Sequence, residues 1–314
     1  MPVIIQSALH PAGPQAASIS HLWWLMFWTC TAVYVVVITM LLVAVRRRSQ
    51  ASDAAATERP LTRSVAAATA ATVVILFGLL FASVVTGRAI GSVGAAEGLV
   101  IEITGNQWWW NVEYHNPDPS LAVTTANELH IPVGRQVRIQ FKSNDVIHSF
   151  WVPNLHGKMD LIPGRQTAIW LQADQPGIYR GQCAEYCGLQ HANMALSVVA
   201  ESSDDFERWL MAQRQPSPSP STPEQQRGFT VVQNGPCAMC HTVRGTDAGG
   251  RTAPDLTHFA TRSTIAAGTV PNVRDNLARW IANPQHLKPG SRMPSTGLSN
   301  EDLQAVLAYL ETLK

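Results

Sequence analysis

The sequence predicts a multidomain membrane protein, with a two-helix transmembrane hairpin followed by a β-sandwich and a small all-α domain. Three observations predict this class: two charge-free apolar runs near the N-terminus, short alternating runs between turn signals, and helix-like runs after a Pro/Ser-rich stretch. At 314 residues the chain has room for about two domains. The net charge is +1, and the sequence shows no concentrated basic face of the kind that a nucleic-acid-binding protein carries. This excludes a nucleic-acid binder.

Residues 1–21 form a polar N-terminal segment without the charged start and cleavage site of a secretory signal. Residues 22–45 and 64–86 carry no charge, and about 20 apolar residues span a bilayer. We assign residues 22–88 to a transmembrane hairpin, although the second run also fits a buried helix of a soluble domain. Arg46–Arg63 carries five basic and two acidic residues, which places this loop in the cytoplasm and both chain ends outside.

Residues 97–212 show short alternating runs separated by Pro-Gly turn signals, a pattern that favours an antiparallel sandwich or barrel. A short helix over 204–211, with acidic residues in its first turn, closes this region. The predicted strands are 99–104, 109–113, 136–142, 167–172, 177–180 and 194–199.

The stretch 181–194 gathers two thiols, an imidazole, a carboxylate and a thioether into one loop between the last two strands. Its soft and borderline donors suit copper or zinc rather than magnesium or calcium. One Cys with a His and a Met would indicate a single blue-copper site, whereas the second Cys favours two thiolates that bridge a pair of copper ions. The candidate ligands are Cys183, Cys187, His191 and Met194, with His148 as the remaining imidazole.

Two other interpretations of this loop remain open. A structural zinc ion held by both Cys and both His residues fits the ligand chemistry but leaves Met194 unused. A disulfide between Cys183 and Cys187 explains neither the His nor the Met. The four-residue spacing also fits one helix face, but Gly181 and Gly188 favour a loop. Cys30 is the only cysteine in the first membrane run, and we interpret it as a small packing residue.

A Pro/Ser-rich linker over 213–226 predicts a semi-rigid tether to a separate domain over 227–314. This domain contains Cys237-Ala-Met-Cys-His241, the attachment signature of c-type haem. Cys237 and Cys240 would form thioethers to the haem, and His241 would be the proximal iron ligand. Helices are predicted over 224–234, over 272–282 and after the Ser299 capping box.

Met293, in a loop between the last two predicted helices, is the candidate for the sixth iron ligand. A His/Met pair raises the haem potential, as electron-transfer cytochromes need. His258 and His286 are the competing ligands and are expected to be surface residues. Met239 lies inside the attachment loop and cannot reach the opposite face of the iron.

Taken together, the two membrane runs and the motifs that follow them resemble cytochrome c oxidase subunit II. The haem domain resembles the bacterial subclass with a fused cytochrome c domain. The resemblance implies a cupredoxin-like β-sandwich and an all-α cytochrome c domain. It is carried by Gly105-Asn-Gln-Trp-Trp-Trp110, the His148 segment, Lys158-Met-Asp-Leu-Ile-Pro-Gly-Arg165 and Gln182-Cys-Ala-Glu-Tyr-Cys-Gly188.

The resemblance also implies roles for single residues. The backbone carbonyl of Glu185 would complete a copper A centre, and its side chain would reach a magnesium or manganese ion shared with subunit I. Trp108 matches the position where electrons enter, whereas Trp109 and Trp110 are expected to pack in the core. Asp160 would lie at the interface with subunit I.

The implied function is that of a subunit of a haem–copper terminal oxidase, in a bacterial inner (plasma) membrane with the copper and haem domains on the periplasmic face. Electrons would pass from a cytochrome c or another donor to the haem, then to copper A and to subunit I, coupled to proton translocation. Subunits I and III and the lipid bilayer are the implied partners. The family's proton-uptake Glu is replaced by Thr62, and we assign that role to no residue, including nearby Glu58.

Other function classes remain open at this stage. A copper A-containing nitric oxide reductase could share this head and anchor, and the partner subunit alone distinguishes it. A quinol oxidase subunit would lack the copper ligands, and a copper-delivery protein would not need His191, Met194 or a haem. The charges suggest attraction between the two domains, since Glu97–Arg208 has net charge −6 and Glu224–Lys314 has +2.

Overall fold

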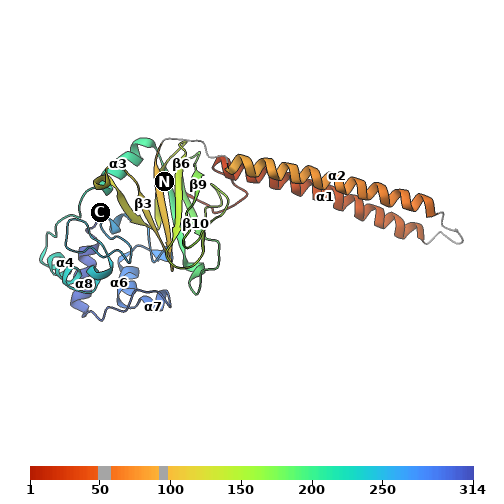
Figure 1. Cartoon of the computed structure of the whole chain (residues 1–314). Coiled ribbons are helices and arrows are strands. Elements are labelled where there is room, and N and C mark those ends of the chain that lie inside the picture. The colour runs from red at the N-terminus through yellow and green to blue at the C-terminus, as the bar shows by residue number, and fades with distance from the viewer. Residues whose placement is uncertain (49–57, 92–97) are drawn as a thin grey trace. The chain divides into compact units, whose positions relative to one another are not determined.

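The computed structural model describes residues 1–48, 58–91 and 98–314 (Figure 1). They fall into two compact units, one formed by Met1–Ala16 with Ala95–Lys314 and the other by Ala17–Gly94. The predicted cytoplasmic loop lies largely outside the described residues, as does the side chain of Glu58.

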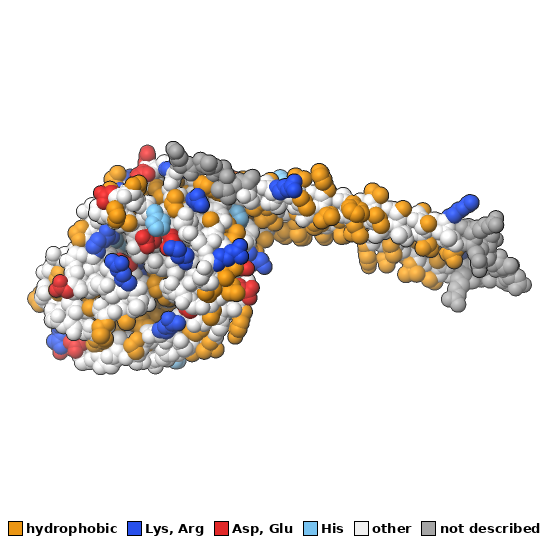
Figure 2. All heavy atoms as spheres, in the orientation of Figure 1, with side chains coloured by type: hydrophobic (Ala, Val, Ile, Leu, Met, Phe, Trp, Pro, Cys, Tyr) orange, Lys and Arg blue, Asp and Glu red, His pale blue; other side chains and the backbone are white. Residues whose placement is uncertain are grey.

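Two long helices, α1 (Pro14–Arg48) and α2 (Glu58–Gly91), contain the two predicted membrane runs. Both are long and apolar enough to cross a membrane. Their large apolar side chains are mostly exposed, as Figure 2 shows along the helices, and lipid is the environment in which such a surface is stable. Each helix begins six residues or more before the charge-free run predicted for it.

The predicted β-sandwich, hereafter the sandwich, consists of two sheets and a closing helix, α3 (Ser203–Gln213). One sheet has the strand order β4-β3-β2-β6-β9, and the other has β5-β11-β10-β7-β8. The first sheet comprises β4 (Val123–Ala126), β3 (Trp109–Tyr114), β2 (Val100–Asn106), β6 (Val137–Ser143) and β9 (Thr167–Leu171). The second comprises β5 (Glu128–Pro132), β11 (Ala195–Glu201), β10 (Gly177–Cys183), β7 (His148–Trp151) and β8 (Met159–Leu161).

The sandwich is mixed rather than wholly antiparallel, which corrects the sequence prediction. β2 pairs with β6 in parallel, and β11 pairs with β5 in parallel. Parallel neighbours cannot be joined by a hairpin, so the chain passes through other strands between them. Hydrophobic alternation reports which face of a strand is buried but does not report strand direction.

Alternation along the strands builds the core between the two sheets. Trp110 on β3 is fully buried, as predicted, whereas Trp109 points to the opposite face and is half-buried. The expectation that Trp109 packs in the core is therefore wrong, because adjacent strand residues face opposite ways. Other fully buried core side chains are Ile101, Ile103, Tyr114, Ile139, Phe141 and Phe150.

The first residues of the chain form part of the sandwich. β1 (Val3–Ile4) pairs in parallel with β10, the strand that ends at Cys183. Asn154 is fully buried, and its amide donates hydrogen bonds to the carbonyls of Ile5 and His10. The sequence had indicated only a polar segment here.

Helices α4 (Pro223–Asn234) and α8 (Asn300–Leu310) cross at the centre of the C-terminal domain, where a Cβ on Gly228 would lie 1.9 Å from the Ala305 carbonyl oxygen. Ser299 caps α8 by accepting a hydrogen bond from the Asp302 amide, as the sequence predicted. The remaining elements are α5 (Cys237–Cys240), α6 (Arg274–Ala282), α7 (Pro284–Leu287), and the short strands β12 (Thr264–Ile265) and β13 (Val270–Pro271).

Candidate functional site

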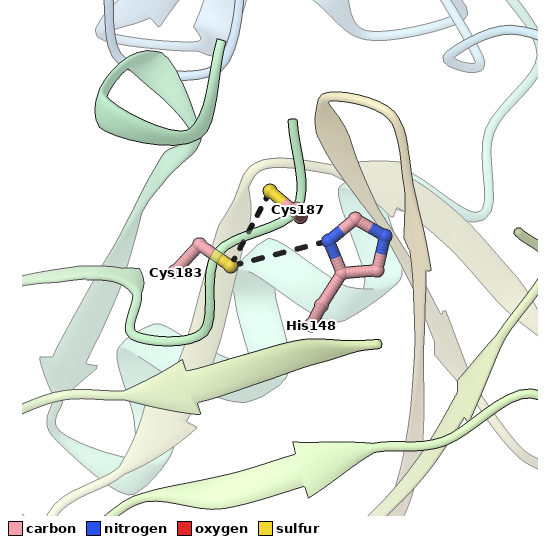
Figure 3. Close-up of side chains that lie close together, drawn as sticks. All are labelled: His148, Cys183 and Cys187. Carbon is pink, nitrogen blue, oxygen red and sulfur yellow. Dashed lines mark hydrogen bonds between the residues drawn. The ribbon is translucent and has the colours of Figure 1, made fainter. Parts of the chain in front are cut away.

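The metal-binding residues predicted from the loop converge at one end of the sandwich. β10 delivers Cys183, β7 begins at His148, and the loop before β11 supplies the others. Cys183 Sγ lies 3.8 Å from Cys187 Sγ and 3.9 Å from His148 Nδ1 (Figure 3). These three side chains are buried, and their ligand atoms all lie within 4.8 Å of one another.

The remaining predicted donors flank this group. Cys187 Sγ lies 3.7 Å from His191 Nδ1 and 3.9 Å from Met194 Sδ. On the other side, the carbonyl oxygen of Glu185 lies 3.2 Å from Cys183 Sγ. The loop and the start of β7 therefore present two central thiols, with one imidazole and one weak outer donor beside each thiol.

This donor set fits two metal ions better than one. A tetrahedral zinc site uses four ligands, which would leave the Met194 thioether and the Glu185 carbonyl without a role. The two thiols lie too far apart for a disulfide, whose sulfur–sulfur bond is about 2.05 Å, and both cysteines are free. Two bridging thiolates with one imidazole each match the expected dinuclear copper site.

Asp145 fixes the orientation of His148, and sequence reasoning missed it. One carboxylate oxygen lies 2.8 Å from His148 Nε2, and the other accepts a hydrogen bond from the Gln107 amide. The imidazole therefore turns Nδ1 toward the sulfurs, as metal-binding histidines do when a carboxylate holds the other nitrogen. The signal was available, because a carboxylate three residues before a ligand His can fold back onto it.

The electrostatic environment of the two thiols favours the binding of a cation. The hydrogen bond between the two sulfurs lowers the pKa of Cys183 to about 3. A hydrogen bond with His148 also lowers this pKa, whereas burial acts to raise it. The same hydrogen bond and burial raise the pKa of Cys187. Burial alone would lower the pKa of His148, but Cys183 and Asp145 outweigh it and raise that pKa. A thiolate and a carboxylate at one buried site create the negative potential that a metal ion neutralises.

Trp108 lies directly against the metal-binding loop. Its indole Nε1 donates a hydrogen bond to the Cys187 carbonyl at 3.0 Å, and the Gln107 side-chain amide donates to the same oxygen at 2.8 Å. Gly188 has φ +112° and a Cβ there would lie 3.1 Å from the Trp108 ring, so the ring and the loop pack without space between them.

The C-terminal domain positions the haem-attachment residues on the single turn α5, with His241 following at its end. His241 Nδ1 lies 2.7 Å from the Pro254 carbonyl oxygen. That bond assigns the proton to Nδ1 and leaves Nε2 free for iron. Burial lowers the pKa of His241, which keeps the imidazole neutral as a metal ligand must be. These residues fit covalent haem c.

The remaining predicted residues concern the haem, its competing ligands and the partner subunit. Met293 is partly buried against the C-terminal core and remains the candidate for the sixth iron ligand. His286 is exposed, as expected, but His258 is buried, with its ring nitrogens facing the carbonyls of Lys314 and Gln215. The surface assignment of His258 is therefore wrong. Exposed Glu185 and Asp160 side chains remain accessible to a partner subunit or ion.

Comparison with known proteins agrees with this chemistry. Residues 117–202 match the family described as cytochrome c oxidase subunit II, periplasmic domain, and residues 225–314 match the cytochrome c family. The chain is 39% identical over 215 residues to cytochrome c oxidase subunit 2 of Alkalihalophilus pseudofirmus, a match that covers 68% of this chain and 61% of that protein. The chain belongs to the cytochrome c oxidase subunit II family.

A second subunit II relative, from Bacillus sp. strain PS3, is 34% identical over 69% of this chain and 62% of its own. The chain thus spans a little over three fifths of these relatives' length. The crystal structure of the periplasmic domain of subunit II from Bradyrhizobium japonicum matches 39% of this chain and 96% of its own at 32% identity, with a TM-score of 0.36.

The match to the subunit II periplasmic domain implies copper A for the sandwich, and the match to the cytochrome c family implies haem for the C-terminal domain. Together with the two helices of membrane-spanning length, it identifies a membrane protein with a periplasmic domain.

Proposed function

We propose that this chain is the electron-receiving subunit of a haem–copper terminal oxidase. Electrons would enter at its own c-type haem and pass through copper A toward the oxygen-reducing site of subunit I, coupled to proton translocation. The observation that carries this proposal is the double-thiol site, whose two sulfurs lie 3.8 Å apart with a His Nδ1 beside each sulfur.

Each residue has a defined part in the proposal. Cys183 and Cys187 would bridge two copper ions, with His148 and His191 at the outer ends and Met194 and the Glu185 carbonyl as weak ligands. Cys237 and Cys240 would bind haem covalently, with His241 and Met293 as its axial ligands. When bound, the two groups supply redox centres that exchange single electrons.

The protein's own contribution is to hold these donors in place and keep water away. Asp145 fixes the His148 ring, and Pro254 fixes the His241 ring, so neither ligand needs to reorient when the oxidation state changes. Burial of both thiols and of Met194 excludes solvent from the copper site. Trp108, bonded to the Cys187 carbonyl, is the proposed point where electrons reach copper.

The proposed organisation follows the sequence boundaries: N-terminal segment 1–21, hairpin 22–88, copper domain 97–212, linker 213–226 and cytochrome c domain 227–314. Proposed partners are subunits I and III and a cytochrome c or another donor, in a bacterial plasma membrane. Glu185 would also bind magnesium or manganese shared with subunit I, where Asp160 makes contact.

A copper A-containing nitric oxide reductase remains the second candidate, because the copper site and anchor described here would serve either enzyme. The test is to purify the chain with its membrane partner and to measure both metal content and substrate. We expect two copper ions and one haem c for this chain, in addition to the haem and copper of the partner subunit, with oxygen consumed and nitric oxide not consumed.

Paramagnetic resonance supplies an independent check of the copper assignment. One unpaired electron shared by two copper nuclei gives a hyperfine pattern that a mononuclear site cannot give. A single copper or a zinc ion would contradict the proposal, and turnover of nitric oxide instead of oxygen would favour the second candidate.

A further inference from the structure

Lys288 is buried without a carboxylate partner. Only 3% of its surface is exposed, and no ion pair involves it among the residues that the structure describes. Its Nζ donates three hydrogen bonds to backbone carbonyls, to Asn193 at 2.7 Å and to Trp108 and Ala266 at 2.8 Å. An ammonium group has three donors, so all are used.

Two of these three acceptors belong to the sandwich, while Lys288 belongs to the C-terminal domain. Asn193 immediately precedes the ligand Met194, and Trp108 binds the carbonyl of the ligand Cys187. Burial lowers the pKa of the Lys288 ammonium, and three carbonyls are the acceptors that a charged group needs at such depth. Lys288 uses all three of its donors in hydrogen bonds, two to the sandwich and one within its own domain, and it therefore joins the two domains.

The next two residues extend the contact. Pro289 offers its carbonyl to the Gln190 side-chain amide at 2.8 Å. Gly290 has φ +82°, and a Cβ there would lie 3.1 Å from Leu189 and 3.6 Å from the Trp108 ring. The segment Lys288–Gly290 therefore lies on Trp108, which keeps only 9% of its surface exposed.

A second contact flanks the first. Ala266 and Ala267 both have left-handed φ values, +53° and +59°, which an L-residue adopts only when its surroundings hold it there. The Ala266 carbonyl binds Lys288, and the Ala267 carbonyl accepts from the Ala195 amide at 2.9 Å. Buried Glu128 accepts from the amide and hydroxyl of Ser263. The two domains thus meet through polar contacts beside the copper loop and at the start of β5.

We propose that Lys288–Gly290 is a docking latch that holds the haem domain on the copper loop and closes Trp108 to any separate electron carrier. An external donor then reduces the C-terminal haem first, and copper receives electrons only from within the chain. This inference rests on the proposed function, and Lys288 acts in it as a positioning residue. The surface that covers Trp108 is therefore part of the same chain.

The test compares Lys288→Met with Arg274→Gln in the full chain assembled with its membrane partner. Arg274 lies in the same domain and pairs with Glu311, so its replacement removes the same charge without touching the sandwich. Hydroxyl-radical footprinting reports the exposure of the Trp108 ring without depending on turnover. Stopped-flow mixing with a reduced soluble cytochrome c reports the order in which haem and copper are reduced.

In the wild type and in Arg274→Gln, we expect Trp108 to be protected and haem reduction to precede copper reduction. In Lys288→Met, we expect labelling of Trp108 to rise and electron transfer from haem to copper within the chain to slow at least about tenfold, because three hydrogen bonds to a charged donor are lost. Copper reduction should then no longer depend on prior haem reduction, since the soluble cytochrome c can reach Trp108. Haem and copper spectra and potentials should not move, which separates loss of docking from damage to either site.

A second pair of variants covers the case in which Lys288→Met does not fold. Gly290→Ala adds a methyl group against Trp108 and Leu189, whereas Gly297→Ala meets nothing within 4 Å. Both positions have positive φ, +82° and +63°, so the backbone penalty is matched. The latch predicts increased Trp108 labelling for Gly290→Ala alone.

Equal labelling in all variants, or copper reduced before haem in the wild type, overturns the latch. That result would leave the proposed function intact if both spectra and oxygen consumption remain. Absence of copper A or haem spectra would instead overturn the proposed function.

Discussion

At the scale of single residues, Asp145 controls the orientation of the proposed copper ligand His148 without being a proposed ligand itself. It lies 2.8 Å from His148 Nε2 and is itself held by the Gln107 amide. The carboxylate therefore fixes which imidazole nitrogen faces the thiols, a role that the residue's distance from the sulfurs would not suggest.

Asp145→Asn is expected to weaken copper binding about 10–100-fold, the usual loss when a carboxylate behind a ligand His is removed. Competition with a chelator on the purified protein measures this. Asp174→Asn is the control, since Asp174 is exposed and its side chain accepts a hydrogen bond from the Gln172 side-chain amide. Equal affinity in both variants would show that His148 is held by the backbone alone.

Met293→Ala is expected to lower the haem potential while the haem stays covalently attached, because a thioether ligand favours reduced iron. Redox titration followed by haem absorption measures the change, and the copper spectrum should not change. An unaltered potential would mean that another residue binds the sixth position.

At the scale of elements, the crossing of α4 and α8 depends on the missing side chain of Gly228. A Cβ there would meet the Ala305 carbonyl at 1.9 Å, a contact with backbone that no side-chain rotation relieves. The helices can approach this closely only at glycine.

Gly228→Ala should therefore destabilise the C-terminal domain by about 3 kcal/mol or more, at the upper end of overpacking costs. Denaturant unfolding followed by haem absorption measures the loss. Gly249→Ala serves as control, because no atom lies within 4 Å of a Cβ built there. Comparable stability of the two variants would mean that the helices separate at little cost.

At the scale of the whole molecule, polar contacts between the sandwich and the C-terminal domain matter more than their net charges. Lys288 and Gln190 donate hydrogen bonds to backbone carbonyls, which salt screens weakly. Among the described residues, the only ion pair between the domains is the long one between Arg292 and Asp145 at 3.7 Å. The attraction expected from opposite net charges would then act mainly before the domains dock.

Electron transfer from haem to copper in the wild type should consequently change by less than about twofold between low and high salt. In Lys288→Met, docking would rely on fewer polar contacts and more on the tether and long-range attraction, so the same rate should fall more steeply as salt is added than in the wild type. Flash photoreduction at several ionic strengths measures both. A steep salt dependence in the wild type would assign docking to net charge after all.

The sequence was informative where the chemistry is local and silent where it is not. The proposed ligands Cys183, Cys187, His191 and Met194 lie within one short stretch, so residue types and spacing were enough to predict that they come together, as the structure shows. Lys288 lies 95 residues from Asn193 and 180 from Trp108, and an isolated lysine in a loop normally indicates a solvated side chain. Its burial follows only from the meeting of two domains.

Fold prediction shows the same division. Strands β3 and β6 carry clear alternation, and they, β2, β9, β10 and β11 were predicted nearly to their ends. β4, β5, β7 and β8 have three to five residues and were not predicted; β9 is as short, but a Pro-Gly turn signal precedes it and another follows it. β1 has two residues and owes its conformation to β10 rather than to its own sequence.

That short strand bears on biogenesis. Val3–Ile4 hydrogen-bonds to a sheet whose other strands follow α2, so the chain must return to the compartment from which it set out. Only an even number of bilayer crossings permits this, as the hairpin provides. Until Val3 and Ile4 have been exported, β10, the strand that carries Cys183, lacks its β1 partner at Ile178 and Tyr179. Metal loading is therefore expected to follow translocation of this N-terminal segment.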